Sequence, residues 1–356
     1  MTMPRATSPG HGWAVPVIVF VALAYGLAWL VALPLWLTAR SGAAIEIDPG
    51  VVPIIVQVTG VVMMFTPTVA ALVCELIWPR VQPGTGVGPG TGTGAGDVGA
   101  VQEGPTEPSA RMAFGDRIKA LPRALGLWPL TPWKRTLGIT AALYVGVWVF
   151  FLVQPFVSAA LFGFTLDLQH FSYFESMLIE QSGGVANPVP VGVIVLIQIL
   201  IGPALALMNV LPAAGEEFGW RGWLLPRLLP LGTWPALLLH GLIWGVWHAP
   251  LTLLGHNFGL FDMWGVLLMS VACMLMGVIL GWSRLVTGSV WPAVFGHAAI
   301  NGAAGIGLLL ASAAHPPNPI VHVGLGVVSW VMMAAIILVG ILVVYRRRAT
   351  ARARAV

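Results

Sequence analysis

Three short groups of polar residues lie inside otherwise apolar stretches of the chain. They are Glu216 and Glu217 with Arg221, Trp244 with His248, and His297 with Asn301. Residues four positions apart share one face of a helix, which is the spacing of Glu217 and Arg221 and of the two members of each other group. A carboxylate can activate water, and imidazole or amide groups can stabilise a developing oxyanion. Together these residue types are typical of amide hydrolysis.

The two adjacent glutamates are expected to differ in role. Glu217 and Arg221 can pair and neutralise each other, whereas Glu216 is rotated by about 100° from Glu217 and is left unpaired. A charged group costs at least ~2.5–3.5 kcal/mol at the centre of a bilayer, so an unpaired carboxylate there needs a function. We expect Glu216 to face a cavity and act as a general base. The alternative is a structural ion pair with a spectator glutamate.

The composition sets the kind of element that must position these groups. Of the 356 residues, 58% are hydrophobic and 8% are charged, and the mean hydropathy is +0.89. This excludes an ordinary soluble enzyme, a disordered protein and a nucleic-acid partner. We predict an all-α polytopic membrane helix bundle with about eight transmembrane helices. The expected spans are about 13–39, 51–79, 136–162, 195–229, 234–254, 261–283, 288–312 and 320–345.

The positions of the charged residues predict the orientation. With eight spans and both termini cytoplasmic, 16 of the 17 Lys and Arg lie on the cytoplasmic side, and Arg40 alone lies outside. Arg outnumbers Lys, and Ala, Gly and Val are abundant, which indicates a bacterial origin. The expected location is therefore the bacterial inner membrane. Both cysteines lie in apolar runs, so no disulfide framework is predicted.

The chain divides into four parts. They are the first two transmembrane helices (1–79), a cytoplasmic loop (80–135), a transmembrane catalytic core (136–345) and a basic cytoplasmic tail (346–356). The loop contains a Gly/Pro/Thr-rich stretch, 81–110, that is expected to be disordered. After it, Phe114, Ile118 and Leu121 recur at helical spacing among basic residues, which predicts an interfacial amphipathic helix. A plain solvated linker is the alternative.

The fourth span is unusual because charged residues interrupt its apolar run. Either the helix ends near Pro212, or it continues to about Leu229 with charges inside the membrane. If it continues, Glu216 lies about 16–20 Å from the cytoplasmic end, at a depth similar to those of His248 and His297. This convergence favours the long helix and a polar pocket that opens to the cytoplasmic side.

Two other polar residues in the spans are expected to be structural. Glu75 lies near the cytoplasmic end of the second span, beside Arg80, where its carboxylate can extend to the interface. His240 lies two turns before His248 and is expected to be a packed, inward-facing histidine.

In chain order, the segments EEFGWR, WGVWH and HAAIN follow the patterns EExxxR, FxxxH and HxxxN. They resemble the CAAX prenyl-protease and bacteriocin-processing (CPBP, or Abi) family of intramembrane endopeptidases, over about residues 190–305. Trp244 stands where the family usually has Phe, and the insertion at 80–110 is particular to this chain.

The resemblance implies hydrolysis of a peptide bond within the membrane. Glu216 would activate a water with support from Glu217 and Arg221, and His248 would hold the water or shuttle protons. His297 and Asn301 would stabilise the oxyanion, with Trp244 in a supporting position. Because a bacterial origin makes prenylated CAAX proteins doubtful substrates, we expect a membrane-associated peptide or protein.

Three alternatives remain open from the sequence. The same Glu and His side chains could bind zinc, although no HExxH motif is present, so we expect no metal and no other cofactor. Buried Glu and His could also form the relay of a proton-coupled transporter, or the chain could be a silent membrane scaffold. No Ser or Cys has an evident catalytic partner.

Overall fold

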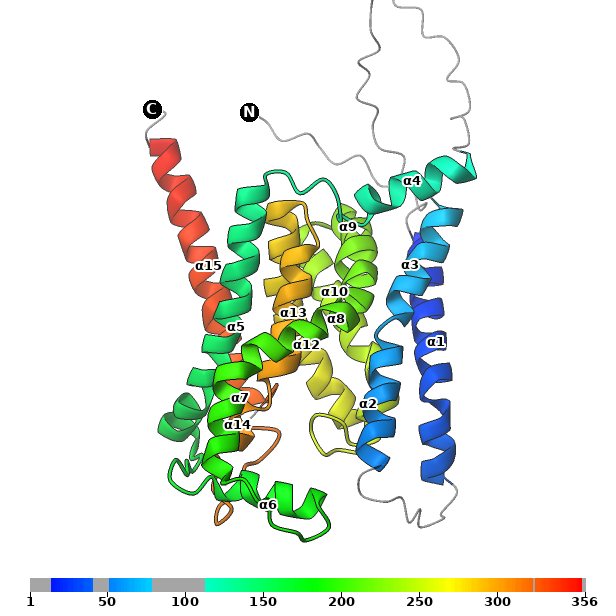
Figure 1. Cartoon of the computed structure of the whole chain (residues 1–356). Helices are drawn as coiled ribbons and strands as arrows, with labels where there is room; N and C mark the ends of the chain where they lie inside the picture. The colour runs from blue at the N-terminus through cyan, green and yellow to red at the C-terminus, as the bar shows by residue number, and fades with distance from the viewer. Residues whose placement is uncertain (1–13, 41–50, 79–112, 323, 354–356) are drawn as a thin grey trace, which may run out of the picture.

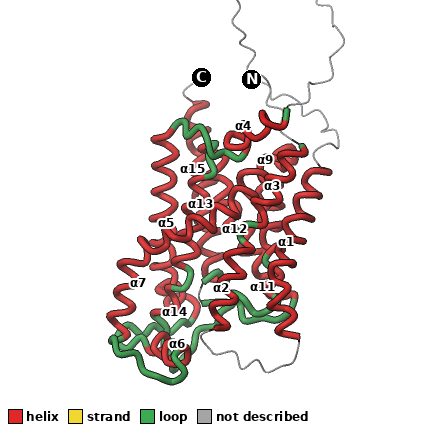
Figure 2. The backbone as a smooth tube through the Cα atoms, turned by 45° about the vertical axis from the view of Figure 1, so that its right-hand side comes forward, coloured by secondary structure: helices red, strands yellow, loops and turns green. Residues whose placement is uncertain are grey.

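The computed structural model describes residues 14–40, 51–78, 113–322 and 324–353. Within these ranges the fold is all-α, as predicted, and the only β-type pairing is an isolated bridge between Leu166 and Ala311. Figures 1 and 2 show one bundle of roughly parallel and antiparallel helices. The predicted disordered stretch 81–110 lies outside the described residues.

The first half of the described helices consists of α1 (Ala14–Arg40), α2 (Val51–Met63), α3 (Thr66–Ile77), α4 (Phe114–Ala124), α5 (Trp133–Phe162), α6 (Ser172–Gln181) and α7 (Val191–Leu205). The segment after α7 consists of η2 (Ala206–Asn209), α8 (Val210–Glu217), η3 (Phe218–Leu224), α9 (Leu225–Leu228) and η4 (Leu229–Leu231). The remaining helices are α10 (Thr233–Trp247), α11 (Ala249–Thr252), α12 (Met263–Thr287), α13 (Trp291–Ala303), α14 (Ile306–Leu309) and α15 (Val327–Ala353).

Seven helical segments of the described chain are long and apolar enough to cross a membrane. They are Ala14–Ala39, Ile54–Ile77, Trp133–Phe162, Val191–Leu231, Met263–Thr287, Trp291–Leu309 and Val327–Arg347. The protein is thus multi-pass, but the predicted count of eight is not confirmed. The span expected over 234–254 forms the 15-residue helix α10 and the short α11 instead. Pro250 at the start of α11 has no N–H to donate, and the preceding helix ends at Trp247.

The fourth span continues past Pro212, as the convergence of the polar groups predicted. From Val191 to Leu231 every residue is helical, although the helix type changes several times. Forty-one residues extend about 60 Å, which is twice the ~30 Å hydrocarbon core, so the segment cannot cross it as one straight perpendicular helix. In Figure 1, α7 accordingly runs obliquely toward α8.

Within this span, η3 is a π-helix, which the sequence analysis did not predict. Pro226 follows it and cannot donate a hydrogen bond to the carbonyl of Gly222, which weakens the regular α-helical pattern at that turn. Such wide turns are frequent at functional sites. Here the π-helix begins directly after Glu217.

The backbone of this span lies unusually close to the junction of α2 and α3. A Cβ atom on Gly219 would lie 2.5 Å from Pro67, and one on Gly215 would lie 2.9 Å from the carbonyl oxygen of Met64. Only glycine allows this approach. The Thr68 hydroxyl donates a hydrogen bond of 2.6 Å to the carbonyl oxygen of Gly215. The residue before Glu216 is therefore held against the neighbouring helix.

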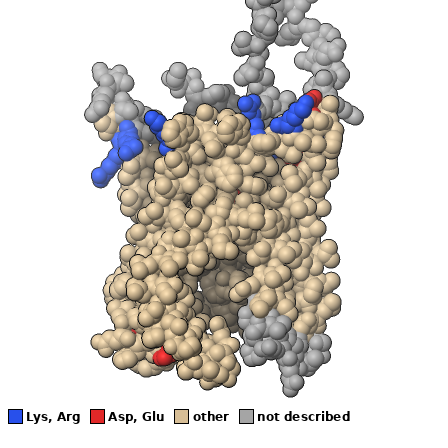
Figure 3. Space-filling view, viewed as in Figure 1, with Lys and Arg blue, Asp and Glu red and all other residues tan. Residues whose placement is uncertain are grey.

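The two ends of the bundle differ in charge. The start of α1 and the ends of α3, α9 and α15 lie at one end, together with α4, whereas α6 lies at the other. The Lys and Arg side chains visible in Figure 3 gather at the end that carries α4. This agrees with a charge bias across a membrane. That this end faces the cytoplasm, and with it both termini, stays a prediction.

The amphipathic helix predicted after the linker forms as α4, rather than a plain solvated linker. Phe114 and Ile118 are 63% and 47% exposed, and Lys119 forms a surface ion pair of 3.7 Å with Asp116. Leu125, directly after the end of α4, is buried, and its carbonyl oxygen would lie 2.9 Å from a Cβ atom on Gly222. Binding of α4 to lipid stays a prediction.

Candidate active site

Glu217 links the first and third polar groups. Its Oε1 accepts a hydrogen bond of 2.6 Å from Nη1 of Arg221 and one of 2.8 Å from Nδ1 of His297. The pairing of Glu217 with Arg221, predicted from their spacing, is confirmed. All three side chains are buried, on α8, η3 and α13. Because a carboxylate accepts only, it fixes the N–H on Nδ1 of His297 and leaves Nε2 for another partner.

Glu216 lies beside this cluster and has different partners. Its Oε2 accepts a hydrogen bond of 2.6 Å from Nε1 of Trp244 and one of 3.2 Å from Nε1 of Trp220. The expectation that Glu216 is left without a charge partner holds among the described residues, because none of their ion pairs involves Glu216. Its two hydrogen bonds from indole N–H groups were not expected. One carboxylate oxygen is thus anchored, and no described residue donates to the other.

Trp244 is the central aromatic side chain of the site. The guanidinium of Arg221 lies 4.1 Å from the centre of its ring, and the ring of His297 lies 5.3 Å away in an edge-to-face arrangement. The indole N–H of Trp244 also donates to Glu216. A phenylalanine, which the resembling family usually has here, lacks this donor. The larger aromatic side chain therefore adds a hydrogen bond to the candidate base.

His248 lies on the other side of Trp244. The two ring centres are 5.8 Å apart, and Nδ1 of His248 is 2.9 Å from the carbonyl oxygen of Trp244. A carbonyl only accepts, so Nδ1 carries the hydrogen and the neutral ring presents a lone pair at Nε2. The chain breaks its helix at this residue, and its side chain is partly exposed. His248 therefore offers an acceptor next to the buried cluster.

Asn301 is the predicted site residue that the structure leaves outside the hydrogen-bonded cluster. It lies one turn after His297 on α13, and its side chain is exposed. In the described part of the chain, its amide forms no hydrogen bond. The expected contact of Asn301 with the oxyanion stays a prediction.

Several buried polar atoms of the site make no hydrogen bond to any described residue. They are Oε2 of Glu217, Nε and Nη2 of Arg221, and both ring nitrogens of His240. Buried polar groups are nearly always hydrogen-bonded, and exceptions concentrate at functional sites. His240 is packed and fully buried, as predicted.

The prediction that the Glu75 carboxylate extends to the interface is wrong. Its side chain is buried rather than extended to the interface, and it forms an ion pair and hydrogen bond with Nη2 of Arg227. The Arg227 guanidinium also lies 3.8 Å from the ring centre of Trp223 and donates to the carbonyl oxygens of Trp223 and Trp78. Burial is possible because Arg227, on α9, supplies the countercharge that the sequence could not place.

No group of three or more His, Cys, Asp or Glu that could hold a metal ion occurs among the described residues. The sulfur of Cys273 lies 3.9 Å from Nδ1 of His248, and Cys74 is buried against α1. Trp220 is the site residue that the sequence analysis missed. Its four-residue spacing from Glu216 was a signal, but aromatic residues at such spacing are more often packing residues.

Residues 198–303 match the family described as type II CAAX prenyl endopeptidase Rce1-like. The match covers 106 of the 356 residues. It begins within α7, ends with α13 and contains all three polar groups, which confirms the resemblance predicted from EEFGWR, WGVWH and HAAIN. Comparison with curated proteins gave no match. The match supports an intramembrane endopeptidase of the CAAX type, and the apolar helices support a multi-pass membrane protein.

Proposed function

We propose that this protein hydrolyses a peptide bond of a membrane-associated peptide or protein, using a water activated by Glu216. The observation that carries the proposal is the asymmetric binding of this carboxylate. Two indole N–H groups hold its Oε2, at 2.6 and 3.2 Å, whereas no described side chain donates to its Oε1. A base fixed on one side and free on the other can accept a proton from water without rearranging.

In the proposed reaction, Oε1 of Glu216 accepts a proton as the water oxygen attacks the scissile carbonyl carbon. The carbonyl π pair moves to the oxygen and gives a tetrahedral oxyanion. His297, as an imidazolium whose Nδ1–H is held by Glu217, donates its Nε2–H to that oxyanion, and the Asn301 amide donates as well. When the C–N bond breaks, its electron pair goes to the leaving nitrogen, which takes the proton held by Glu216. Hydrogen-bond donors aimed at the oxyanion are usually the largest contribution to such catalysis.

Glu217 and Arg221 act on this reaction through His297. Because Glu217 accepts from Nδ1, the imidazole is held in one orientation with Nε2 directed to a ligand. Arg221 compensates the Glu217 charge at 2.6 Å. A buried carboxylate without this cation would not remain ionised at low cost.

His248 is assigned the second contact to the water. Its Nδ1–H is occupied by the carbonyl oxygen of Trp244, so Nε2 is an acceptor that orients the water or carries its proton. The partial exposure of this side chain agrees with contact to a ligand.

We propose that no metal takes part, with a zinc-dependent reaction by the same residues as the alternative. The support is that Glu217 is committed to Arg221 and His297, and one oxygen of Glu216 is committed to two indoles. The test is the zinc content of the purified protein and the effect of a chelator on cleavage. Unchanged turnover after chelation is expected. Stoichiometric zinc whose removal abolishes cleavage would overturn the metal-free reaction.

The proposed location is a bacterial inner membrane. Access to the site from the cytoplasmic side stays a prediction. At the basic end, Leu127 packs against a buried apolar cluster that includes Ala214 and Ala298, which are close in sequence to Glu216 and His297. The hollow visible in Figure 3 lies in the half of the molecule away from the Lys and Arg side chains.

The experiment that tests the function compares membrane peptides from cells with the native protein and cells with Glu216→Gln. We expect uncleaved precursors to accumulate with Glu216→Gln, and with no change for the matched control Glu180→Gln, an exposed residue of α6. A membrane-peptide profile that is identical for all three proteins would contradict an endopeptidase role.

A further inference from the structure

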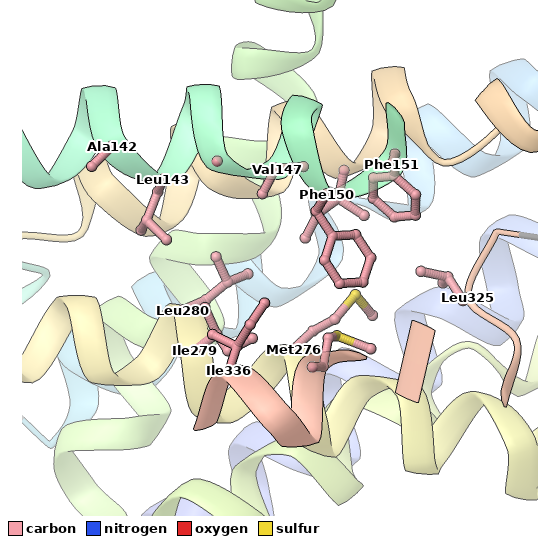
Figure 4. A pocket seen from close by; sticks show the side chains of 13 residues that line it. Ala142, Leu143, Val147, Phe150, Phe151, Met276, Ile279, Leu280, Leu325 and Ile336 are labelled. Atoms are coloured by element: carbon pink, nitrogen blue, oxygen red, sulfur yellow. The ribbon is translucent and has the colours of Figure 1, made fainter. Parts of the chain in front are cut away.

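An apolar crevice lies on the outside of the bundle, away from the catalytic groups. It has a volume of about 180 Å³ and is lined by side chains of α5, α12 and α15, with Ile300 of α13 among its 13 lining residues. All 13 are apolar or glycine. In Figure 4, Leu143 and Phe150 of α5 face Met276 of α12 and Ile336 of α15. Apolar cavities of about 150 Å³ stay dry and bind hydrocarbons such as benzene.

The crevice opens toward the surface of the bundle that lipid surrounds. Gly146 on α5 is exposed, and Ile336 on α15 is 49% exposed. All three helices are candidate membrane spans, so an occupant enters from the hydrocarbon region. The lining offers no donor or acceptor for a peptide, which favours a purely hydrocarbon occupant.

Two arginines lie on the same faces of α5 and α15 as residues that line the crevice, nearer to the headgroup region. Arg135 precedes Gly146 on α5 by 11 residues, and Arg347 follows Ile336 on α15 by 11 residues. Eleven residues are about three turns, so each arginine is within about 20° of its lining residue and about 16 Å along the helix. Half of a hydrocarbon core is about 15 Å, which places both guanidinium groups at headgroup depth.

Both arginines are available to an anion. Their side chains are exposed, and neither takes part in an ion pair among the described residues. The start of α5 and the end of α15 lie side by side in both Figure 1 and Figure 2, at the same end of the bundle. The hydrocarbon crevice and the two cations are thus separated by the length of one lipid leaflet.

We propose that this groove is a binding site for one anionic phospholipid, with an acyl chain in the crevice and the phosphate between Arg135 and Arg347. The site is separate from the proposed peptidase chemistry, because none of its lining residues belongs to the catalytic cluster. Bound lipid would fill the space behind α13, the helix that carries His297.

The crevice can be filled by a single substitution. A Cβ atom on Gly146 would have no neighbour within 4 Å, so Gly146→Leu places its side chain in the crevice without a backbone clash. Gly138→Leu is the matched control, because it lies on the same helix, is equally free of neighbours and does not line the crevice.

The cation pair has its own matched control. Arg135→Gln with Arg347→Gln removes the two charges above the crevice. Lys134→Gln with Arg346→Gln removes two charges from the adjacent positions, which are rotated by about 100° to other faces of the same helices. Both double variants lose the same net charge.

The experiment is native mass spectrometry of the full chain in detergent, titrated with phosphatidylglycerol or with phosphatidylcholine of identical acyl chains. We expect one retained lipid and about tenfold tighter binding of phosphatidylglycerol. Gly146→Leu should remove retention of both lipids, and Arg135→Gln with Arg347→Gln should remove only the preference. Thermal stability of each variant checks that it is folded.

Three results would overturn the proposal. They are equal binding of the two lipids by the native chain, equal loss of preference in the two double variants, and equal retention by Gly146→Leu and Gly138→Leu. The second result would show diffuse attraction by surface charge, and the third would show that lipid binds elsewhere. None of these results bears on peptide cleavage, so this inference and the proposed function are tested separately.

Discussion

Two buried carboxylate–arginine pairs each use an arginine of the same long helical segment, Val191–Leu231, and their surroundings differ. Glu217 pairs with Arg221, and Glu75 pairs with Arg227. In both pairs the guanidinium lies over a tryptophan ring, at 4.1 Å from Trp244 and at 3.8 Å from Trp223. By residue type alone the two pairs are nearly equivalent.

The difference lies in how completely their polar atoms are bonded. Arg227 donates to two backbone carbonyls in addition to Glu75 and joins α9 to α3. In the other pair, Oε2 of Glu217 and two nitrogens of Arg221 have no partner among the described residues. A fully bonded buried pair fixes a packing arrangement, whereas an incompletely bonded one can respond to a ligand. We infer that the Glu75–Arg227 pair is structural and the Glu217–Arg221 pair is functional.

The largest effect that separates the two pairs is expected from Glu217→Gln. The amide can no longer hold His297 as a carboxylate does, and loss of such an orienting charge lowers turnover by about 10²–10⁴-fold. The measurement is the turnover rate of purified, reconstituted protein on a cleaved peptide. Glu75→Gln is the control and should retain the native turnover per folded molecule. Equal loss in both variants would remove the distinction between the pairs.

The second prediction concerns stability, and here Glu75→Gln, the control of the first prediction, is the variant that is expected to change. Glu75→Gln leaves the Arg227 charge buried without its countercharge, and breaking a buried pair costs about 3–5 kcal/mol of the free energy of unfolding. Unfolding by denaturing detergent measures this quantity. Replacing both residues, Glu75→Met with Arg227→Met, should recover part of the loss because no lone charge remains. If Glu75→Gln were as stable as the native protein, the pair would not hold α3 to α9.

A smaller effect is expected from Trp244→Phe, which removes one indole donor to Glu216 and keeps an aromatic ring. A hydrogen bond to a charged group contributes about 1.5–3 kcal/mol, so turnover should fall by about 10-fold to 100-fold. Trp247→Phe is the matched control, because its indole donates to Thr66 and not to the site. Native turnover in Trp244→Phe would show that the indole contact is dispensable.

The smallest effect is expected at a carboxylate outside the spans. Asp167 accepts hydrogen bonds from the Ser172 hydroxyl, at 2.6 Å, and from the backbone N–H groups of His170 and Ser172. These donors, the hydroxyl first, hold the pKa of Asp167 well below its ordinary value. The ionised form therefore stabilises the folded loop above the ordinary carboxyl pKa of about 3.9, and this contribution is lost as the pH falls through the lowered pKa.

Ser172→Ala tests this pH dependence. The difference in thermal stability between Ser172→Ala and the native protein should be constant from pH 7 to about pH 5 and should shrink below about pH 4. A difference that grows on acidification would contradict the sign of the pKa shift at Asp167.

The features predicted correctly from the sequence are those that depend on local spacing. The four-residue interval of Glu217 and Arg221 predicted their pairing, and long apolar runs predicted the seven helical segments that are long and apolar enough to cross a membrane. The three motifs predicted the family of residues 198–303. The amphipathic pattern after the linker likewise predicted α4.

The features that were missed depend on contacts between distant parts of the chain. Glu75 and Arg227 are 152 positions apart, and nothing local to Glu75 indicates its buried partner. The indole of Trp244 reaches Glu216 across 28 positions. The helix breaks at His248, so α10 is only 15 residues long and the span expected over 234–254 does not form as one helix. Helix packing decides each of these features, and periodicity carries no information about it.

The most direct test of the central claim is the turnover of Glu216→Gln, measured in reconstituted membranes on a peptide that the native protein cleaves. The carboxylate that accepts the proton from water is replaced by an amide of the same shape, which accepts no proton at neutral pH. We expect cleavage by Glu216→Gln to fall to background while its thermal stability stays close to native, and we expect Glu180→Gln to cleave normally. Native turnover by a folded Glu216→Gln protein would contradict that claim.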